Sequence, residues 1–227
     1  MADEGRIHRG SDGGYSDARE REPRQTALMG SITWGRDIAE VYDATYSAQF
    51  APSVLDPIVD LLTELARGGP ALEFAVGTGR VAIPLNARGI SVQGIELSPH
   101  MVEQFRAKPG ADTVPVTTGD MAIARVPGTF KLVYLVANTI MNVTTQEEQL
   151  RVFANAAAHL ESGGCFVVEV IVPQLRSVSL EETRRVFTLD PEHVGIETFD
   201  DLVEQIAWSH HWMEVGGRLA RHSAPCG

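Results

Sequence analysis

The stretch most able to do chemistry joins an apolar segment to a pair of glycines. Residues 71–76 are apolar apart from Glu73, and Gly77, Thr78 and Gly79 follow directly. Glycines at a turn from strand to helix let the backbone approach a ligand closely, because no Cβ stands in the way. The helix that follows offers its free N–H groups at the same place. This stretch therefore predicts a cradle for a nucleotide-type ligand.

Two further acidic residues follow the next two apolar stretches. Glu96 ends residues 91–96, at the distance from the glycines that brings a carboxylate to a ribose in a strand–helix–strand unit. Asp120 stands between Gly119 and Met121 after a third apolar stretch, where it can accept a hydrogen bond from an adenine amino group. Together these residues predict an adenosine-containing cofactor.

Composition limits the kinds of partner. The 227-residue chain carries a net charge of −11, which argues against a nucleic-acid partner because such binding needs clustered Lys and Arg. We expect no membrane partner and a cytoplasmic location, since no apolar run reaches the length of a membrane span and the N-terminus lacks an apolar signal core. Cys165 and Cys226 belong to no metal-ligand pattern, so we expect no metal site.

The order of elements predicts an α/β protein. Residues 1–28 have almost no apolar periodicity, so we expect a disordered leader. Two helices are predicted before the glycines, from Gly35 and from Ser53, the second capped by Ser53 with Asp56. Strands and helices then alternate, which predicts a doubly wound parallel sheet. The predicted ranges are strand 71–76, helix 79–88, strand 91–97, helix 99–107, strands 114–119 and 130–137, helix 145–161 and strand 165–172.

Thr145 and Glu148 form a capping box at the start of the last long helix, and Gly163 and Gly164 are expected to end it.

The pattern changes after Pro173. The ranges 184–189, 193–199, 202–213 and 218–223 predict short strands joined by turns. We therefore predict three parts: the leader at 1–28, a nucleotide-binding domain at 29–172 and an antiparallel β appendage at 173–227.

The glycine turn by itself is compatible with two classes of enzyme. Residues 77–82 satisfy the GxGxxA pattern of an NAD-dependent oxidoreductase, in which Glu96 would hold the adenosine ribose. Glu73 has no role in such a site, where its charge would repel the pyrophosphate. An acid at that position suits a cofactor with a cationic amino-acid end.

The ordered set of motifs resembles the class I S-adenosylmethionine-dependent methyltransferases of the small-molecule type. The motifs are residues 72–80, 94–98, 119–121 and 133–142, within a resemblance that covers about 34–172. The chain is most similar to actinobacterial enzymes of secondary metabolism, including amino-sugar N-methyltransferases. The resemblance implies a Rossmann-like sheet of order 3-2-1-4-5-7-6, and the sequence ends before the last two strands. We therefore expect the C-terminal strands to be missing.

The resemblance also implies a set of site residues. The cofactor S-adenosyl-L-methionine would lie against Tyr42, Glu73, Gly77, Thr78, Gly79, Arg80, Glu96, Leu97, Met101, Asp120, Met121, Ala137 and Asn138. Glu73 and the glycines would cradle the methionine end, Glu96 the ribose and Met101 and Asp120 the adenine, with the helix of residues 41–46 as a lid.

The catalytic residue remains unassigned, with Asn142, Tyr46 and His211 as candidates. Asn142 stands where the amino-sugar enzymes tend to have His, and Asn can orient an acceptor but cannot take its proton. The predicted reaction is transfer of a methyl group by in-line displacement to an N or O nucleophile of a small molecule, mainly through proximity and orientation. An NAD-dependent oxidoreductase and a catalytically inactive S-adenosylmethionine-binding protein remain alternatives, and a homodimer is left open.

Overall fold

A five-stranded parallel sheet forms the first part of the structure. The computed structural model describes residues 34–171, 184–191, 193–201, 206–215 and 217–226, so the predicted leader lies outside the described residues. The strands are β1 (Ala71–Phe74), β2 (Val92–Glu96), β3 (Val116–Thr118), β4 (Phe130–Leu135) and β5 (Leu160–Val168). Their order is β3-β2-β1-β4-β5 and each neighbouring pair is parallel, which confirms the doubly wound α/β prediction.

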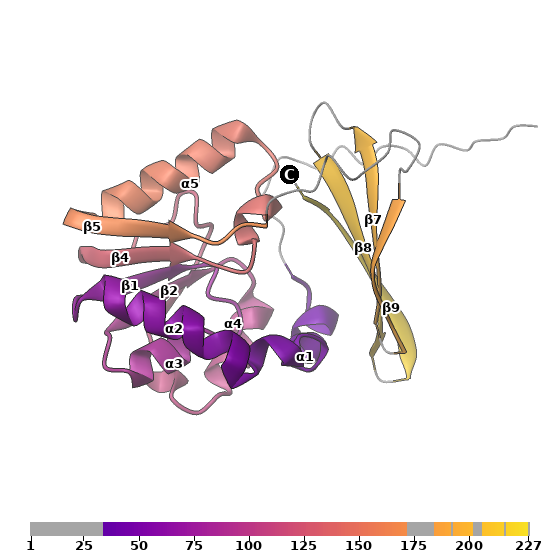
Figure 1. The fold of residues 1–227 in the computed structure, drawn as a ribbon, viewed down its shortest axis with the longest axis horizontal. Helices are drawn as coiled ribbons and strands as arrows, with labels where there is room; N and C mark the ends of the chain where they lie inside the picture. Colours follow the sequence, from indigo (N-terminus) through magenta and orange to yellow (C-terminus); the bar gives the residue numbers. More distant parts are fainter. Residues whose placement is uncertain (1–33, 172–183, 192, 202–205, 216, 227) are drawn as a thin grey trace, which may run out of the picture. The chain divides into compact units, whose positions relative to one another are not determined.

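Helices cover both faces of this sheet. They are α1 (Arg36–Thr45), α2 (Pro52–Ala66), α3 (Ala82–Ala87), α4 (Pro99–Arg106) and α5 (Gln146–His159), with short 3-10 turns η1 (Ser47–Phe50), η2 (Ala111–Thr113) and η3 (Thr139–Asn142). In Figure 1, α5 lies on one side of the sheet, and α2 and α3 lie on the other. Strand β1 is buried at all four positions because both of its faces are covered, as expected for a central parallel strand.

Two apolar cores hold these layers together. On the side of α2 and α3, Leu62 and Leu85 pack against Leu132 of β4. On the side of α5, Val152 packs against Leu72 of β1, and the same core continues along both strands. Each fully buried side chain of this size stabilises the fold by about 1.5–3 kcal/mol relative to an exposed one. The two cores thereby fix β1 and β2, whose carboxyl ends carry the predicted site.

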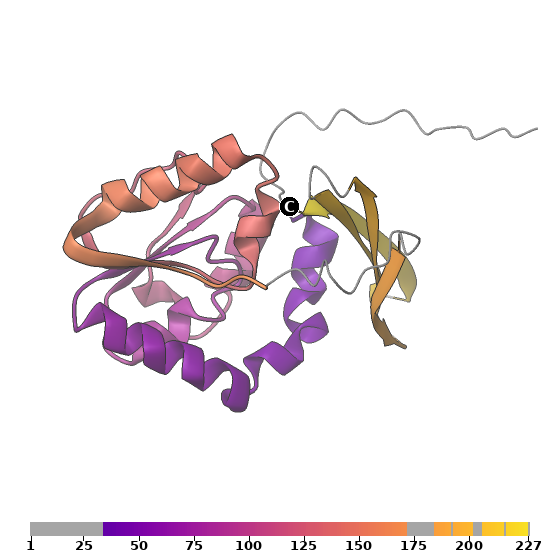
Figure 2. The same cartoon turned by 45° about the horizontal axis from the view of Figure 1, so that its top comes forward.

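A second sheet has four antiparallel strands. They are β6 (Arg184–Asp190), β7 (His193–Asp201), β8 (Ile206–Val215) and β9 (Arg218–Cys226), in the order β6-β7-β8-β9. The predicted appendage is thus confirmed as an antiparallel sheet, with strands that differ in their limits from the prediction. In the described part of the chain the parallel sheet has five strands rather than seven, and β5 stands at its edge. Figure 2 gives a second view of both sheets.

Two predicted details around the helices are wrong. Helix α2 begins at Pro52 with Ala51 as its N-cap, and no side chain caps it, so Ser53 is already inside the helix. Proline suits the first helical position because it has no N–H that needs an acceptor. The predicted strand at 165–172 begins instead at Leu160, directly after α5. Gly163 and Gly164 therefore do not end the helix, and a register shift in the pairing of β4 with β5 falls beside them.

The capping box of α5 yields a first test. Glu148 N–H donates to Thr145 Oγ1 at 3.2 Å, and Thr145 Oγ1 donates to Glu148 Oε2 at 2.8 Å. Thr145→Ala removes this cap and should lower the free energy of unfolding by about 1 kcal/mol in urea denaturation, with an unchanged m-value. Ser53→Ala serves as the matched control and should change stability little. Equal losses in the two variants would contradict the assignment of the two helix starts.

Candidate functional site

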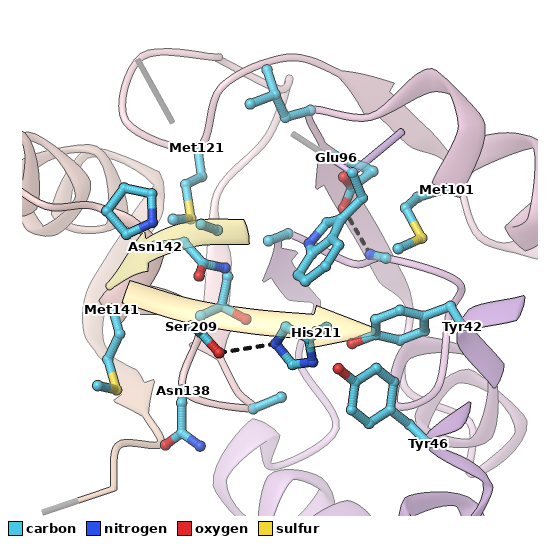
Figure 3. Close-up of a pocket in the computed structure, with 18 of the residues that line it drawn as sticks. Tyr42, Tyr46, Glu96, Met101, Met121, Asn138, Met141, Asn142, Ser209 and His211 are labelled. Carbon is cyan, nitrogen blue, oxygen red and sulfur yellow. Dashed lines mark hydrogen bonds between the residues drawn. The ribbon is translucent and has the colours of Figure 1, made fainter. Parts of the chain in front are cut away.

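One cavity lies beyond the carboxyl ends of the parallel strands. It has a volume of about 350 Å³, within the usual range for sites that bind small molecules. Its wall is formed by α1, by the loops after β1, β2, β3 and β4, and by the antiparallel sheet (Figure 3). Ligands of open α/β sheets bind at this edge, beyond the strand ends.

The glycine loop makes a tight turn at the floor of this cavity. Gly77 and Gly79 have φ values of 57° and 85°, and Ala75 has a φ of 52°, all in the left-handed region that favours glycine. A Cβ on Gly79 would lie 2.6 Å from the ring of Phe105, so no larger residue fits there without a shift. The turn directs Gly77 N–H at the carboxylate of Glu96, 2.8 Å away.

Glu96 connects the two turns that flank the cavity. Its Oε2 accepts from Gly77 N–H and its Oε1 accepts from Ser98 N–H, both at 2.8 Å. The side chain is only 5% exposed, and burial raises the pKa of this carboxyl, although the backbone N–H groups of Ser98 and Gly77 act in the opposite direction. Each carboxylate oxygen retains a second lone pair, which can accept from a ligand hydroxyl.

An apolar slot continues from Glu96. Met101 and Met121 are buried and line the cavity together with Leu97. Asp120 also lines it, and its Oδ1 accepts from Ala122 N–H at 2.8 Å. Two carboxylates with apolar side chains between them fit the ribose and the adenine of an adenosine. The structure thus brings these predicted residues together.

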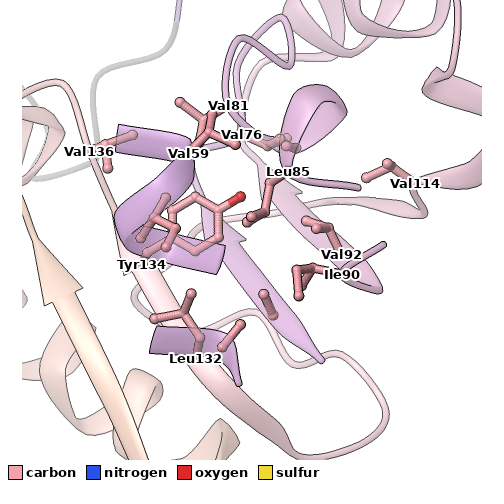
Figure 4. Close-up of a cluster of buried hydrophobic side chains, with 14 of the residues drawn as sticks. Val59, Val76, Val81, Leu85, Ile90, Val92, Val114, Leu132, Tyr134 and Val136 are labelled. Carbon is pink, nitrogen blue, oxygen red and sulfur yellow. The ribbon is translucent and has the colours of Figure 1, made fainter. Parts of the chain in front are cut away.

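Glu73 is not brought to the cavity. It is 3% exposed, and its Oε2 accepts from the hydroxyl of Tyr134 at 2.9 Å. Tyr134 lies inside the core cluster on the side of α2, near Val59 and Leu85 (Figure 4). Burial, as the main cause, raises the pKa of Glu73 to about 8, so this carboxyl is mostly protonated at neutral pH. The predicted role of Glu73 as a negative charge beside a cationic cofactor end is therefore not supported.

Thr78, Gly79 and Arg80 also lie outside the cavity wall. Thr78 is 2% exposed, and its Oγ1 donates to Asp43 of α1 at 2.6 Å, while Lys108 pairs with the same carboxylate. The hydrogen bond from Thr78 to Asp43 therefore connects the glycine loop to α1. The predicted contact of Thr78, Gly79 and Arg80 with a cofactor stays a prediction.

Helix α1 supplies an aromatic part of the wall. Tyr42 and Tyr46 line the cavity, with ring centroids 4.7 Å apart, and Trp34 lines it as well. Ser98 Oγ, which also accepts from Met101 N–H at the start of α4, donates to the carbonyl of Trp34 at 2.5 Å. Burial raises the pKa of Tyr46 to about 12, so its hydroxyl remains a donor at neutral pH.

The loop after β4 supplies the neighbouring part of the wall. Ala137 and Asn138 both line the cavity and both have left-handed backbones, with φ values of 59° and 58°. Ala137 N–H donates to Glu169 Oε2 at 2.7 Å, which ties this loop to the residue after β5. Asn142, at the end of η3, lines the cavity too. The structure therefore gathers all three residues at one site.

The antiparallel sheet forms another part of the cavity wall, and most of its lining residues were not predicted from the sequence. Glu197 of β7 pairs in register with Ser209 of β8, and both line the cavity with His211. Alternation along β8 puts Ser209 and His211 on one face and His210 on the other. His210 indeed contacts Thr198 and Ser223 rather than the cavity. This alternation was visible in the sequence, but the strand pairing that adds Glu197 was not.

The family comparison agrees with this geometry. Residues 71–164 match a family model described as a methyltransferase domain. The matched stretch runs from β1 into β5 and contains the glycine loop and Glu96. The resemblance seen in the sequence is thereby confirmed over this stretch, which is similar to a methyltransferase domain, and the strand order is that of a Rossmann-like fold.

Individual relatives narrow the comparison. The dTDP-4-amino-2,3,4,6-tetradeoxy-D-glucose N,N-dimethyltransferase of Saccharopolyspora spinosa is 30% identical over 143 residues, which are 61% of this chain and 56% of that protein. The chain thus spans little more than half the length of this curated relative. The CcbJ methyltransferase of Streptomyces caelestis has a TM-score of 0.66 and 28% identity, over 85% of this chain and 79% of that chain.

A further solved structure shares the fold. CalS10, an amino pentose methyltransferase of Micromonospora echinaspora with bound S-adenosylmethionine, has a TM-score of 0.59 and 22% identity, over 82% of this chain and 80% of that chain. None of the helices in the described part of this chain combines the length and apolar character that a membrane crossing requires.

The buried carboxyl of Glu73 predicts a distinctive pH dependence. Between its ordinary pKa of 4.5 and its raised value of about 8, Glu73 is protonated in the folded state and ionised in the unfolded state. The free energy of unfolding should therefore fall as pH rises through this window, by roughly 3 kcal/mol at pH 7. Glu73→Gln should remove this decline and raise stability at pH 7, as measured by urea denaturation.

Glu64→Gln makes the same change at an exposed position of α2 and provides the control. It should leave the pH dependence of unfolding as it is in the wild-type protein. An unaltered decline between pH 5 and 8 in Glu73→Gln would refute the assignment of a protonated Glu73.

Proposed function

We propose that this protein transfers a methyl group from S-adenosyl-L-methionine to an amine nitrogen of a small-molecule acceptor. The observation that carries the proposal is the single cavity in which Glu96 and the apolar slot lie at one end and a set of polar side chains lies at the other. The matched methyltransferase domain supports the reaction, and the curated relative's name, an amino-sugar N,N-dimethyltransferase, supports an amine.

The cofactor end is assigned to the residues around Glu96. A bound S-adenosyl-L-methionine would supply an electrophilic methyl group on its sulfonium. Glu96 would accept from the ribose hydroxyls, because both of its oxygens are already oriented by backbone N–H groups. Met101 and Met121 would flank the adenine, and Asp120 would accept from the adenine amino group.

The acceptor end is assigned to the residues of α1, η3 and the antiparallel sheet. Tyr42 and Tyr46 would cover the acceptor and exclude water, while Asn138 and Asn142 would orient it through hydrogen bonds. Such positioning can supply much of the rate enhancement of a displacement reaction, because the two reactants are already held together and the step becomes effectively unimolecular. A neutral amine needs no strong base for the attack itself. This agrees with Asn142, whose amide does not act as a base at neutral pH.

Several finer statements stay predictions. These are the domain limits at 29–172 and 173–227, a cytoplasmic location, a role in secondary metabolism and a homodimer. The alternative of an NAD-dependent oxidoreductase receives no support from the matched domain, whereas an inactive S-adenosylmethionine-binding protein differs from the proposal only in turnover.

Calorimetric titration with S-adenosylhomocysteine and, separately, with NAD tests the cofactor. We expect binding of the former alone, with a loss of affinity of about tenfold or more in Glu96→Gln, since a buried hydrogen bond to a charged group is worth about 1.5–3 kcal/mol. Glu73→Gln is the matched control and should bind as the wild-type protein does. Binding of NAD alone would overturn the proposal.

The acceptor class requires a second measurement. The purified protein should be incubated with S-adenosyl-L-methionine and dTDP-4-amino-2,3,4,6-tetradeoxy-D-glucose, the sugar in the relative's name, or with the same sugar bearing a hydroxyl at position 4. We expect mass spectrometry to detect one or two added methyl groups on the amine and none on the hydroxyl. Methylation of the hydroxyl compound alone would refute N-methylation.

A further inference from the structure

A line of hydrogen bonds leads from the cavity wall into the antiparallel sheet. Ser209 Oγ and His211 Nε2 lie 2.9 Å apart on β8, and both residues line the cavity (Figure 3). On its other side, His211 Nδ1 lies 2.9 Å from Nε2 of His193 on β7. The two imidazole rings are nearly parallel and meet edge to edge, with centroids 5.2 Å apart and an angle of 15° between their planes. The three side chains form one continuous chain of polar atoms.

The chemistry of imidazole decides the direction in which protons can move along these three side chains. A neutral histidine has one ring nitrogen that donates and one that accepts, so it can take a proton at one nitrogen and release a proton from the other. If Ser209 donates to Nε2 of His211, then Nδ1 of His211 carries the proton and donates to His193. In this arrangement the lone pairs of Ser209 Oγ are available to a group inside the cavity.

The surroundings of His211 keep it neutral. It is 8% exposed, and burial, followed by the nearby His193 and His222, lowers its pKa to about 4. The titratable groups around His211 are Tyr42, Tyr46 and Glu197, which line the same cavity, and His193, His210 and His222 of the antiparallel sheet. A neutral ring can pass a proton along without retaining it.

His193, at the end of this series of hydrogen bonds, is less enclosed than His211. His193 is only partly buried, and burial lowers its pKa while the carboxylate of Asp190 acts in the opposite direction. A proton that reaches His193 therefore arrives at a residue with access to water and with a carboxylate nearby.

We propose that Ser209, His211 and His193 form a proton relay that carries the proton of the methylated acceptor nitrogen from the cavity to solvent. This inference rests on the proposed amine methylation. With S-adenosyl-L-methionine bound, the lone pair of a neutral amine would form the new C–N bond as the bond between that methyl carbon and the sulfonium sulfur breaks. S-adenosylhomocysteine would leave, and the nitrogen would keep a positive charge and an N–H proton to lose. That proton passes to Ser209 Oγ as the hydroxyl proton of Ser209 passes to His211 Nε2. The Nδ1 proton of His211 then passes to His193 Nε2, and His193 releases its own Nδ1 proton to water.

The relay restores the lone pair of the nitrogen inside the cavity. An ammonium has no lone pair, so a second methyl group can be accepted only after the first proton has left. Ser209 and His211 are proton-transfer residues in this scheme, and His193 acts through His211.

The rival explanation is that these hydrogen bonds only hold β7 and β8 together. His210 offers a matched comparison, because it bridges Thr198 and Ser223 on the opposite face of the same sheet and does not line the cavity. The same substitution at His210 therefore perturbs the sheet but removes none of the hydrogen bonds of the relay.

The first arm of the test is nitrogen NMR of the full chain labelled at histidine, without any acceptor. We expect His211 to remain in one neutral tautomer between about pH 5 and 8. Ser209→Ala and His193→Gln should shift its ring nitrogen signals, and His210→Gln should not. Titration of His211 at its ordinary pKa of about 6.5 would overturn the relay, because the ring would then be solvated.

The second arm follows methylation of the amine sugar against pH. His211→Gln and Ser209→Ala should lower kcat by about 10- to 100-fold, with the largest loss at low pH and little change in KM. Ser209→Thr keeps the hydroxyl and should retain most of the activity, as should His210→Gln. Binding of S-adenosylhomocysteine to each variant shows that it is folded.

The outcomes separate the relay from the proposed function. A pH-independent loss, or an equal loss in His210→Gln, would assign these histidines a structural role and overturn the relay. Failure of the wild-type protein to methylate the amine would remove the proposed function, and the NMR arm would still decide whether the hydrogen-bonded chain exists.

Discussion

The carboxylate of Glu96 is the constraint on which the rest of the site depends. It receives one backbone N–H from the loop after β1 and one from the turn after β2. These two loops would otherwise be independent, because each belongs to a different strand. A buried carboxylate without such donors would be costly, so the two turns are held in the positions that stabilise it. The same turns form the floor of the cavity.

The fold allows this arrangement because its strands are fixed from both sides. The cores on the two faces of the sheet position the carboxyl ends of β1 and β2, and the polar groups gather where the cores end. A second buried acid, Glu73, lies only a few residues from the loop, yet its environment is the opposite. The carboxyl of Glu96 lines the cavity, whereas that of Glu73 lies outside it and accepts from a tyrosine inside the core. Position relative to the end of the strand decides which of the two acids can meet a ligand.

Much of the site was predictable because its signals are local. Glu96 ends β2, Met101 and Asp120 follow β2 and β3 within a few residues, and the capping box at Thr145 is complete within four residues. The burial of Glu73 against Tyr134 was not predictable, since it arises from the register of β1 with β4, two strands far apart in sequence. The joint position of Glu197 and Ser209 likewise depends on the pairing of β7 with β8. Spacing along the sequence determines which side chains lie near the end of one strand. Pairing between distant strands determines which side chains of different strands contact one another.

The attachment of α1 has a consequence for motion. Asp43 of this helix accepts a hydrogen bond from Thr78, and Trp34, two residues before the helix, accepts one from Ser98. Both attachment points belong to the turns that Glu96 joins, so opening of α1 and loosening of those turns are coupled events. Local opening is rarer when a ligand stabilises the closed state. Slower hydrogen exchange at the amides of α1 would therefore report on the occupancy of a cavity floor built from residues far away in the sequence.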